Sequence, residues 1–342
     1  MKVAILTDSF PPYISGVSTY CVSLAKELIK KGHKVLIMAP KDENNVIPHG
    51  LEKAKIVRLP SFSSPPSITT LRFCLPNTSL VTRKIKAFKA DIIEIEGPTF
   101  LGIDGLLASK ILNIPCVSTF HTFTTSKEYL QLIFKIKSRN LERISWAYHR
   151  WFYNSGNFVF ATTPKMLKIM AKNGIKKSKM SPITLLFDFE RVNFLNEQEK
   201  ATLKKFYGLK KNVAVFLGRI SKEKNLDTLI KIWAGVIKKN PNSTLLIIGG
   251  GPYEKRIKKL IAKLKIGSNV VLTGVIENER LLKSGLLSIC DVFVSASISE
   301  TFGLTGIEAM ASNLPVILFK SQGVSEIVDN AGFVIKHGLK AS

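Results

Sequence analysis

The feature that most constrains the fold is a regular alternation of short apolar runs and helical segments along the 342 residues. The runs at 3–7, 35–39 and 213–217 are apolar on nearly every residue, which is typical of strands that are covered on both faces. Turns that contain Gly, Pro or Asn separate the segments. The alternation predicts right-handed β-α-β units and doubly wound parallel sheets.

Two such series follow one another. In the first, strands are expected at 3–7, 35–39, 55–59, 91–96, 116–119 and 159–162, and helices at 19–31, 80–89, 102–112 and after Pro164. In the second, strands are expected at 213–217, 244–248, 270–273, 292–296 and 315–319, and helices at 225–239, 253–264, 279–288 and 304–311. We therefore expect an α/β chain with two Rossmann-like domains that face each other across a cleft: 1–182, a linker 183–194, and 195–342.

The chain is strongly basic. It carries 50 Lys and Arg against 25 Asp and Glu, a net charge of +25, and the excess is heavier in the first half. Such a charge attracts nucleic acid, anionic lipid or phosphorylated small molecules. No apolar segment is long enough to span a membrane, and the first residues do not resemble a signal peptide. Four cysteines without CxxC spacing lie in apolar runs, so buried, reduced thiols in a cytosolic chain are expected.

Ligands of open parallel sheets bind beyond the carboxyl ends of the strands, so the loops after strands are the candidate sites. Arg219 follows the strand 213–217, and Lys224 lies five residues further, where the next helix begins. Two cations beside helix N-terminal amides suit a pyrophosphate group, although a solvated charge run would also contain them. The chain contains neither GxGxxG nor GxxxxGK[ST], which disfavours a dehydrogenase or a P-loop enzyme.

Glycines occur in two other loops of this kind. Gly16 precedes a helix start, where free N–H groups can bind an anion, and an ordinary strand-to-helix turn is the alternative. The three glycines at 249–251 permit close approach of a ligand, and a plain flexible turn explains them nearly as well.

Three further residues are candidates by position. Glu300 ends the loop after strand 292–296, and Glu308 follows eight residues later on a helix among apolar neighbours. A carboxylate there can accept hydrogen bonds from ligand hydroxyls, although a solvated helix face is the usual place for one. His121 lies at the carboxyl end of strand 116–119 and could bind a substrate hydroxyl, or be a purely structural residue.

The segment 127–153 mixes cations with large apolar residues at helical spacing. The first interpretation is a core-facing stripe that includes Leu141, Ile144, Tyr148 and Trp151 on an ordinary helix. The alternative is an interfacial helix that inserts aromatic side chains below anionic headgroups. In that case the membrane contacts are Lys135, Lys137, Arg139, Arg143 and Trp151.

Taken together, these segments resemble glycosyltransferase family 4, whose members have the two-domain GT-B fold. The resemblance spans nearly the whole chain. It is carried by Pro-Pro-x3-Gly-Val at 11–17, Phe-His at 120–121, Gly218-Arg219 with Lys224, Gly-Gly-Gly-Pro at 249–252, and Glu300-x7-Glu308 followed by Ala-Met-Ala.

The resemblance implies an enzyme that transfers a sugar from a nucleotide sugar with retention of configuration, with no cofactor and no bound metal. The implied catalytic residues are His121, Arg219, Lys224 and Glu300. The implied donor-binding residues are Gly16, Gly218, Arg219, Lys224, Gly250, Glu300, Phe302, Gly303, Leu304 and Glu308. Arg219 and Lys224 would hold the diphosphate, Glu300 the sugar hydroxyls and Glu308 the ribose, with His121 at the reacting sugar.

The segments 6–12 and 119–122 are similar to the diacylglycerol glucosyltransferase branch of monotopic enzymes. This implies transfer of a hexose from a UDP-glucose-like donor to a membrane lipid such as diacylglycerol. It also implies a cytoplasmic protein, peripheral at the inner face of an anionic membrane, with acceptor in the first domain, donor in the second and no specific nucleic acid. A soluble acceptor (a sugar, sugar phosphate or thiol precursor) is the alternative, and a non-catalytic polyanion binder is a remote one.

The sequence departs from the family pattern in two places. The usual interdomain Pro-Asn-Gly-Ile/Val-Asp is replaced by Pro-Ile-Thr-Leu-Leu-Phe-Asp at 182–188. The chain stops at Ser342, soon after a strand-like 332–335, where family members continue with a helix that crosses back to the first domain. A short or truncated second domain is therefore expected.

Overall fold

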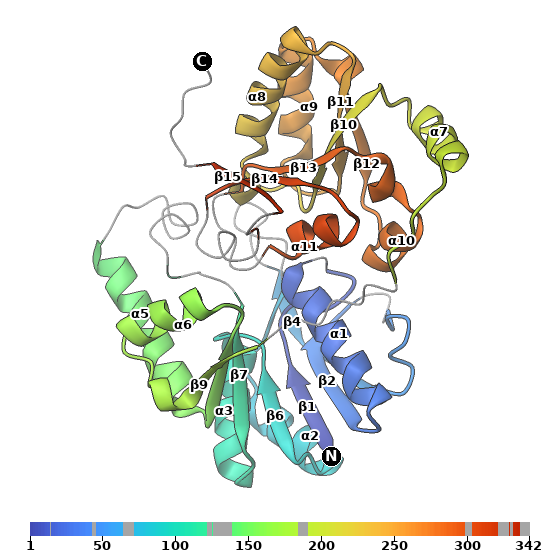
Figure 1. Ribbon diagram of the computed structural model, residues 1–342. Coiled ribbons are helices and arrows are strands. Elements are labelled where there is room, and N and C mark those ends of the chain that lie inside the picture. The colour runs from blue at the N-terminus through green and yellow to red at the C-terminus, as the bar shows by residue number, and fades with distance from the viewer. Residues whose placement is uncertain are drawn as a thin grey trace. The chain divides into compact units, whose positions relative to one another are not determined.

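The computed structural model describes residues 1–13, 15–42, 46–63, 72–121, 125, 139–183, 191–297, 303–320, 328 and 331–335, with only the backbone of Arg139. The chain divides into two compact units, Met1–Leu186 (unit 1) and Phe187–Ser342 (unit 2), each built around one parallel sheet (Figure 1). The division falls inside the segment 183–194 that the sequence predicts as a linker.

Unit 1 contains a seven-stranded parallel sheet in the order β3-β2-β1-β6-β7-β8-β9. Its strands are β1 Lys2–Leu6, β2 Lys34–Pro40, β3 Lys55–Leu59, β6 Ile92–Ile95, β7 Cys116–Phe120, β8 Phe158–Ala161 and β9 Met180–Pro182. The central strand β1 pairs with β2 and β6 in parallel, with Val3 opposite both Val35 and Ile92.

Helices cover both faces of this sheet. Helix α1 Gly16–Lys30 lies on one face, and α2 Thr78–Phe88, α3 Phe100–Leu112, α5 Arg139–Ser155 and α6 Pro164–Lys172 lie on the other. Val3 and Ile5 of β1 pack in the core under α1, whereas Ala4 and Leu6 pack under the other helices. Both faces of the strand are therefore buried, which explains its continuous apolar run.

A short antiparallel hairpin, β4 Ser61–Ser63 with β5 Arg72–Cys74, was not expected from the sequence. Strands of three residues are too short to show a period. The hairpin is attached to the main sheet by a buried carboxylate, because the Cys74 N–H donates to Oδ1 of Asp8 at 2.7 Å, just after β1.

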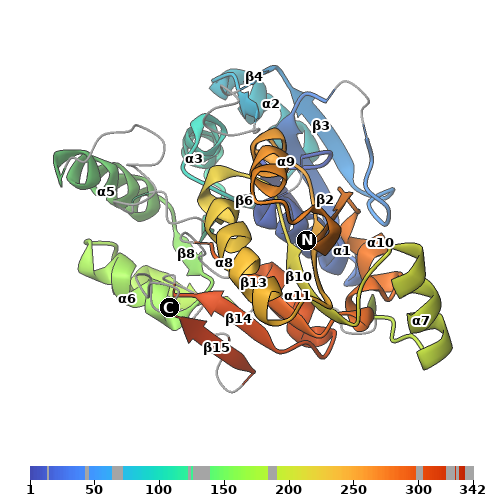
Figure 2. The ribbon, with the colours of Figure 1, turned by 90° about the horizontal axis from the view of Figure 1, so that it is seen from above.

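Unit 2 contains a six-stranded parallel sheet in the order β12-β11-β10-β13-β14-β15. Its strands are β10 Asn212–Leu217, β11 Ser243–Ile248, β12 Val270–Gly274, β13 Val292–Ser295, β14 Val316–Phe319 and β15 Gly332–Ile335. Helices α8 Leu226–Lys239 and α9 Glu254–Lys263 lie beside one another on one face (Figures 1 and 2). Helices α10 Asn278–Lys283 and α11 Leu304–Ala311 cover the other, and α7 Glu197–Phe206 precedes the sheet.

The prediction of a helix at 279–288 is wrong for the second half of this range. Helix α10 ends at Lys283, and a 3-10 turn, Leu286–Ile289, follows. Gly285 has a φ of 69°, and a Cβ atom there would lie 2.5 Å from the Leu195 side chain, so the chain turns where Leu195 packs. All four cysteines are buried and free, as predicted.

Gly102→Ala should lower the free energy of unfolding by about 1–3 kcal/mol, because a Cβ atom on α3 would lie 2.2 Å from the Gly97 carbonyl oxygen and 3.1 Å from the Phe152 ring. Gly235→Ala is the matched control. It lies on α8 with no atom within 4 Å of the new Cβ, so it should stabilise by up to about 1 kcal/mol. Calorimetric unfolding measures both, and equal effects would contradict the packing described here.

Candidate active site

The loops after β10 and β11 are joined backbone to backbone. The Gly218 N–H donates to the Ile248 carbonyl oxygen at 3.0 Å, and the Ile220 N–H donates to that of Gly250 at 2.9 Å. A Cβ atom on Gly249 would lie 2.0 Å from the Gly218 oxygen, and both Gly249 and Gly251 have positive φ. These two glycines are therefore required by the contact with the neighbouring loop.

Arg219 begins the polar part of the loop between β10 and α8. Its Nη2 donates to Oε1 of Glu223 at 2.6 Å, and the Ser221 hydroxyl donates to the same oxygen at 2.6 Å. Burial raises the pKa of Glu223, but the Arg219 charge and the Ser221 hydrogen bond outweigh burial, so the pKa is lowered. The carboxylate is ionised and holds the guanidinium in place.

Lys224 lies on the same loop, at the end of the 3-10 turn Lys222–Lys224. The Ser297 hydroxyl, which follows β13, donates to the Glu223 carbonyl oxygen at 3.4 Å. The loops after three neighbouring strands, β11, β10 and β13, are thus linked by hydrogen bonds, and Arg219 and Lys224 lie in the central one.

Glu308 is buried in α11, the helix that follows β13. Its Oε1 accepts a 2.7 Å hydrogen bond from Nδ2 of Asn278, the first residue of α10. Burial raises the pKa of Glu308 to about 7, and the Asn278 hydrogen bond acts in the opposite direction. Sequence reasoning missed Asn278, because its partner is 30 residues away and no motif contains it.

The N-terminus of α11 is formed by two of the predicted residues. Gly303 has a φ of 74° and occupies the N-cap position, and Leu304 is the first helical residue. The backbone N–H groups of the first turn therefore point out of the N-terminal end of the helix. Glu300 and Phe302, which precede them, lie outside the described residues.

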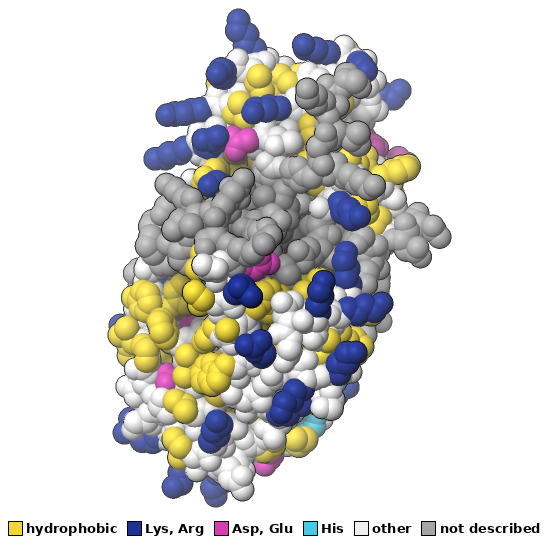
Figure 3. Space-filling view, turned by 90° about the vertical axis from the view of Figure 1, so that its left-hand side faces the viewer, with side chains coloured by type: hydrophobic (Ala, Val, Ile, Leu, Met, Phe, Trp, Pro, Cys, Tyr) yellow, Lys and Arg dark blue, Asp and Glu magenta, His cyan; other side chains and the backbone are white. Residues whose placement is uncertain are grey.

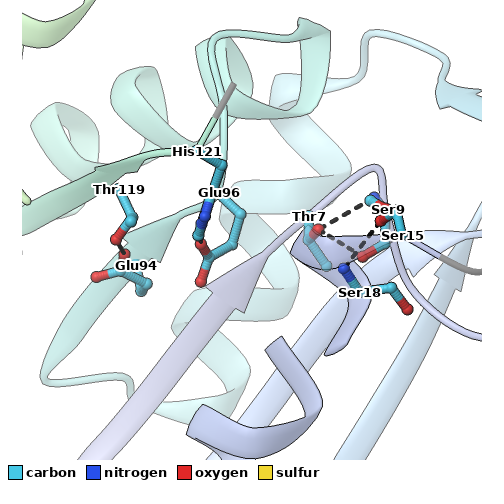
Figure 4. A network of polar contacts seen from close by, with 8 residues as sticks. All are labelled: Thr7, Ser9, Ser15, Ser18, Glu94, Glu96, Thr119 and His121. Atoms are coloured by element: carbon cyan, nitrogen blue, oxygen red, sulfur yellow. Dashed lines mark hydrogen bonds and ion pairs between the residues drawn. The ribbon is translucent and has the colours of Figure 1, made fainter. Parts of the chain in front are cut away.

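In unit 1, hydroxyl groups hold the loop between β1 and α1. The Ser9 N–H donates to the Thr7 hydroxyl at 3.0 Å, and the Ser9 and Ser15 hydroxyls lie 2.5 Å apart (Figure 4). The Ser15 hydroxyl also accepts from the Ser18 N–H and caps α1. Gly16, the first residue of α1, is therefore placed at the start of a capped helix.

His121 follows β7 and lies against the end of β6. Its Nε2 is 2.5 Å from Oε2 of Glu96, and its side chain is 8% exposed, against 0% for Glu96 (Figure 4). The Tyr20 ring of α1 meets the imidazole edge-on, with 4.6 Å between ring centroids. Two residues before Glu96, Oε1 of the buried Glu94 accepts a 2.7 Å hydrogen bond from the Thr119 hydroxyl. Sequence reasoning found His121 but neither glutamate.

The first interpretation of α5, in which Ile144 and Trp151 belong to a core-facing stripe, is wrong for these two residues. Ile144 and Trp151 are 65% and 53% exposed, and Arg143 is exposed. The core contacts of the helix come instead from Trp146, His149, Phe152 and Tyr153, because this helix has large apolar residues on both faces. Lys135 and Lys137 lie outside the described residues, as does the side chain of Arg139.

Helix α3 presents a second apolar surface, which the sequence did not predict. Phe100, Leu107 and Ile111 are 47%, 42% and 65% exposed, and they lie on one side of the helix. In the lower part of Figure 3, one face of unit 1 shows hydrophobic side chains mixed with Lys and Arg and with few acidic groups. Within the described ranges, no helix has the length and hydrophobicity to cross a membrane.

Comparisons with known proteins match both units. The family profile described as Glycosyltransferase Family 4 matches residues 14–191, and that described as Glycosyl transferases group 1 matches 197–341. Alpha-monoglucosyldiacylglycerol synthase of Acholeplasma laidlawii is 30% identical over 93% of this chain and 80% of its own. The Streptococcus pneumoniae protein of the same name is 29% identical over 97% and 74%.

Among solved structures, HepE of Anabaena in complex with UDP-glucose superimposes with a TM-score of 0.77. It is 20% identical and covers 99% of this chain and 86% of its own. This likeness confirms the predicted fold class, a GT-B fold with two Rossmann-like domains.

Proposed function

The chain belongs to glycosyltransferase family 4, and we propose that it is a retaining enzyme that transfers glucose from UDP-glucose to a membrane lipid, diacylglycerol. The observation that carries the proposal is the linked set of loops after β11, β10 and β13, in which the Glu223 carboxylate accepts hydrogen bonds from both the Arg219 guanidinium and the Ser221 hydroxyl. The choice of sugar and acceptor is supported by the names of the two synthases that resemble nearly the whole chain.

In this proposal unit 2 binds the donor. Arg219 and Lys224 bind the diphosphate, and amides at Gly303 and Leu304 add hydrogen bonds at a helix N-terminus. Glu308 accepts hydrogen bonds from the ribose hydroxyls, and Glu300, Phe302, Gly218 and Gly250 complete the donor site. Unit 1 takes the acceptor, with His121 at the reacting sugar and Gly16 near the phosphates.

The cations that bind the diphosphate also account for the glucose transfer. The acceptor hydroxyl oxygen forms a bond to glucose C1 on the face from which UDP departs, and the bond from C1 to the phosphate oxygen breaks with its electron pair on UDP. The proton of the hydroxyl moves to the leaving phosphate. Negative charge grows on the diphosphate as the bond breaks, so fixed cations at Arg219 and Lys224 stabilise the transition state more than the ground state. No cofactor and no metal ion is part of this proposal.

The acceptor is supported by the surface of unit 1. Three of the exposed apolar residues, Ile111 of α3 and Ile144 and Trp151 of α5, are next in sequence to exposed cations, Lys110, Arg143 and Arg150. Helix α2, which packs beside α3, exposes Arg83 and Lys86. Exposed apolar residues accompanied by cations suit an anionic lipid surface, because the apolar groups enter the headgroup region while the cations bind the headgroups. The protein would then be peripheral at the inner face of the membrane; a soluble acceptor is the alternative.

Replacing Arg219 with Ala should reduce the rate of glucose transfer about 100-fold, because one fixed charge at the leaving group is lost. The assay incubates radiolabelled UDP-glucose with diacylglycerol vesicles, and the product should be an α-glucoside. Lys222→Ala removes an exposed cation of the same loop and should leave the rate unchanged. Transfer by Arg219→Ala at the wild-type rate would remove Arg219 from the site, and consumption of UDP-glucose only with a soluble sugar would favour the alternative acceptor.

Affinity for UDP-glucose should rise roughly tenfold between pH 6 and pH 8. A carboxylate accepts hydrogen bonds from both ribose hydroxyls, and the pKa of Glu308 near 7 makes this form dominant only above neutral pH. Isothermal titration measures the dissociation constant, and UDP-glucose itself does not titrate in this range. The Glu308→Gln variant should bind more weakly and without the pH dependence, and a tenfold rise that survives in this variant would exclude Glu308 as its cause.

The wild-type protein should sediment with vesicles that contain phosphatidylglycerol and much less with phosphatidylcholine, and added salt should weaken the binding. The double variant Leu107→Ser, Ile111→Ser should lose most of the binding, because two exposed apolar side chains no longer enter the lipid. Phe206→Ser, at a 79% exposed position in unit 2, is the control and should bind like the wild type. No binding of the wild type at low salt would exclude a membrane acceptor.

A further inference from the structure

Glu96 and His121 come from neighbouring strands and touch at a buried point. Ile95, the last residue of β6, pairs with Ser118 of β7, and this register brings the two side chains together beyond the strand ends. Nε2 of His121 lies 2.5 Å from Oε2 of Glu96. The other carboxyl oxygen, Oε1, is buried and has no hydrogen-bond partner among the described residues.

We propose that Glu96 is a positioning residue for His121, and that its carboxyl group decides whether Nδ1 of the imidazole donates or accepts a hydrogen bond. The inference rests on the proposed function, in which His121 lies at the reacting sugar. No motif in the sequence assigns Glu96, and the proposed transfer does not otherwise use it.

The protonation states follow from burial. A buried carboxylate with an unpartnered oxygen is strongly disfavoured, so the neutral acid is the stable form. Burial raises the pKa of Glu96 to about 8 and lowers that of His121 to about 3. Near pH 7 both groups are therefore neutral, and the short contact is a hydrogen bond from the Glu96 O–H to Nε2. A neutral imidazole that accepts at Nε2 carries its proton on Nδ1.

Deprotonation of Glu96 reverses the direction of its hydrogen bond with His121. Above about pH 8 the carboxyl group loses its proton, and the imidazole proton is then best placed on Nε2, from which it donates to the carboxylate. Nδ1 becomes an acceptor. The titration of Glu96 therefore converts Nδ1 of His121 from a donor to an acceptor, without ionisation of the histidine.

The neighbouring titratable groups do not change this direction. Among the residues that the structure describes, the titratable groups that interact electrostatically with Glu96 are Glu94 on β6, Tyr20 and Cys21 on α1, and Tyr153 on α5. Burial is the largest cause of the pKa shift in each of the four, and it raises each pKa, so the uncharged form is favoured. None of the four is a cation that could hold Glu96 ionised.

A donor at Nδ1 can hydrogen-bond a sugar oxygen that carries no proton, such as the ring oxygen, whereas an acceptor at Nδ1 can pair only with a hydroxyl group that donates to it. The proposal therefore predicts that kcat falls about tenfold per pH unit above pH 8. The affinity for UDP should not change with this titration, because neither Glu96 nor His121 is among the residues proposed to bind the nucleotide.

The test compares Glu96→Gln with Glu94→Gln. Glu94, on β6, is equally buried and its carboxyl group accepts from the Thr119 hydroxyl, so its variant controls for loss of a buried carboxyl group. A glutamine at 96 can still hydrogen-bond Nε2 but cannot titrate. Glu96→Gln should keep kcat within about tenfold of wild type at pH 7 and lose the fall above pH 8, whereas Glu94→Gln should retain that fall. Glu96→Asp, with a shorter carboxyl group that still titrates, covers the case in which the glutamine variant does not fold.

A second readout does not depend on activity. Nitrogen-15 NMR of the His121 ring should show a protonated Nδ1 at pH 7 and a protonated Nε2 above pH 9 in the wild type, and no exchange of tautomers in Glu96→Gln. A protonated Nε2 at pH 7, or an unchanged alkaline fall in Glu96→Gln, would overturn the proposal. If no glucose is transferred to lipid at all, the proposed function fails, but the NMR comparison still decides the role of Glu96.

Discussion

Parallel strands in register end along the same edge of a sheet, and the arrangement of every candidate group depends on this constraint. Leu217 of β10 lies opposite Ile248 of β11, so Arg219 and Gly249 follow neighbouring strand ends. The pairing of β6 with β7 brings Glu96 to His121 in the same way. Because both faces of each sheet are covered by helices, the edge formed by the strand ends is where loops can present polar groups.

Within unit 2 the loops are fixed before any ligand arrives. Gly249 and Gly251 allow one loop to lie directly against the carbonyl oxygens of the next, and Glu223 holds the Arg219 guanidinium. A charge that is held in place loses little entropy when it binds a diphosphate. Burial acts in the opposite direction on the carboxyl groups of Glu94, Glu96 and Glu308, because it raises their pKa values and so favours the protonated form.

Much of the fold could be predicted because strands covered on both faces are continuous apolar runs, and α11 and β3 occur where they were expected. The hairpin β4–β5 could not, because three-residue strands have no period. Arg219 and His121 were identifiable from their positions after strands. Glu96 and Asn278 were not, because their partners lie 25 and 30 residues away and only the folded chain joins them. The exposure of Trp151 also escaped prediction, since α5 has aromatic residues on both faces.

The central claim is that the loops after β10, β11 and β13 hold the nucleotide sugar. A crystal structure of the complex with UDP-glucose tests it most directly. The account predicts the diphosphate within hydrogen-bond distance of Arg219 and Lys224, and the ribose hydroxyls on the Glu308 carboxylate. A nucleotide bound with its phosphates away from Arg219, or with no hydrogen bond between its ribose hydroxyls and Glu308, would contradict it.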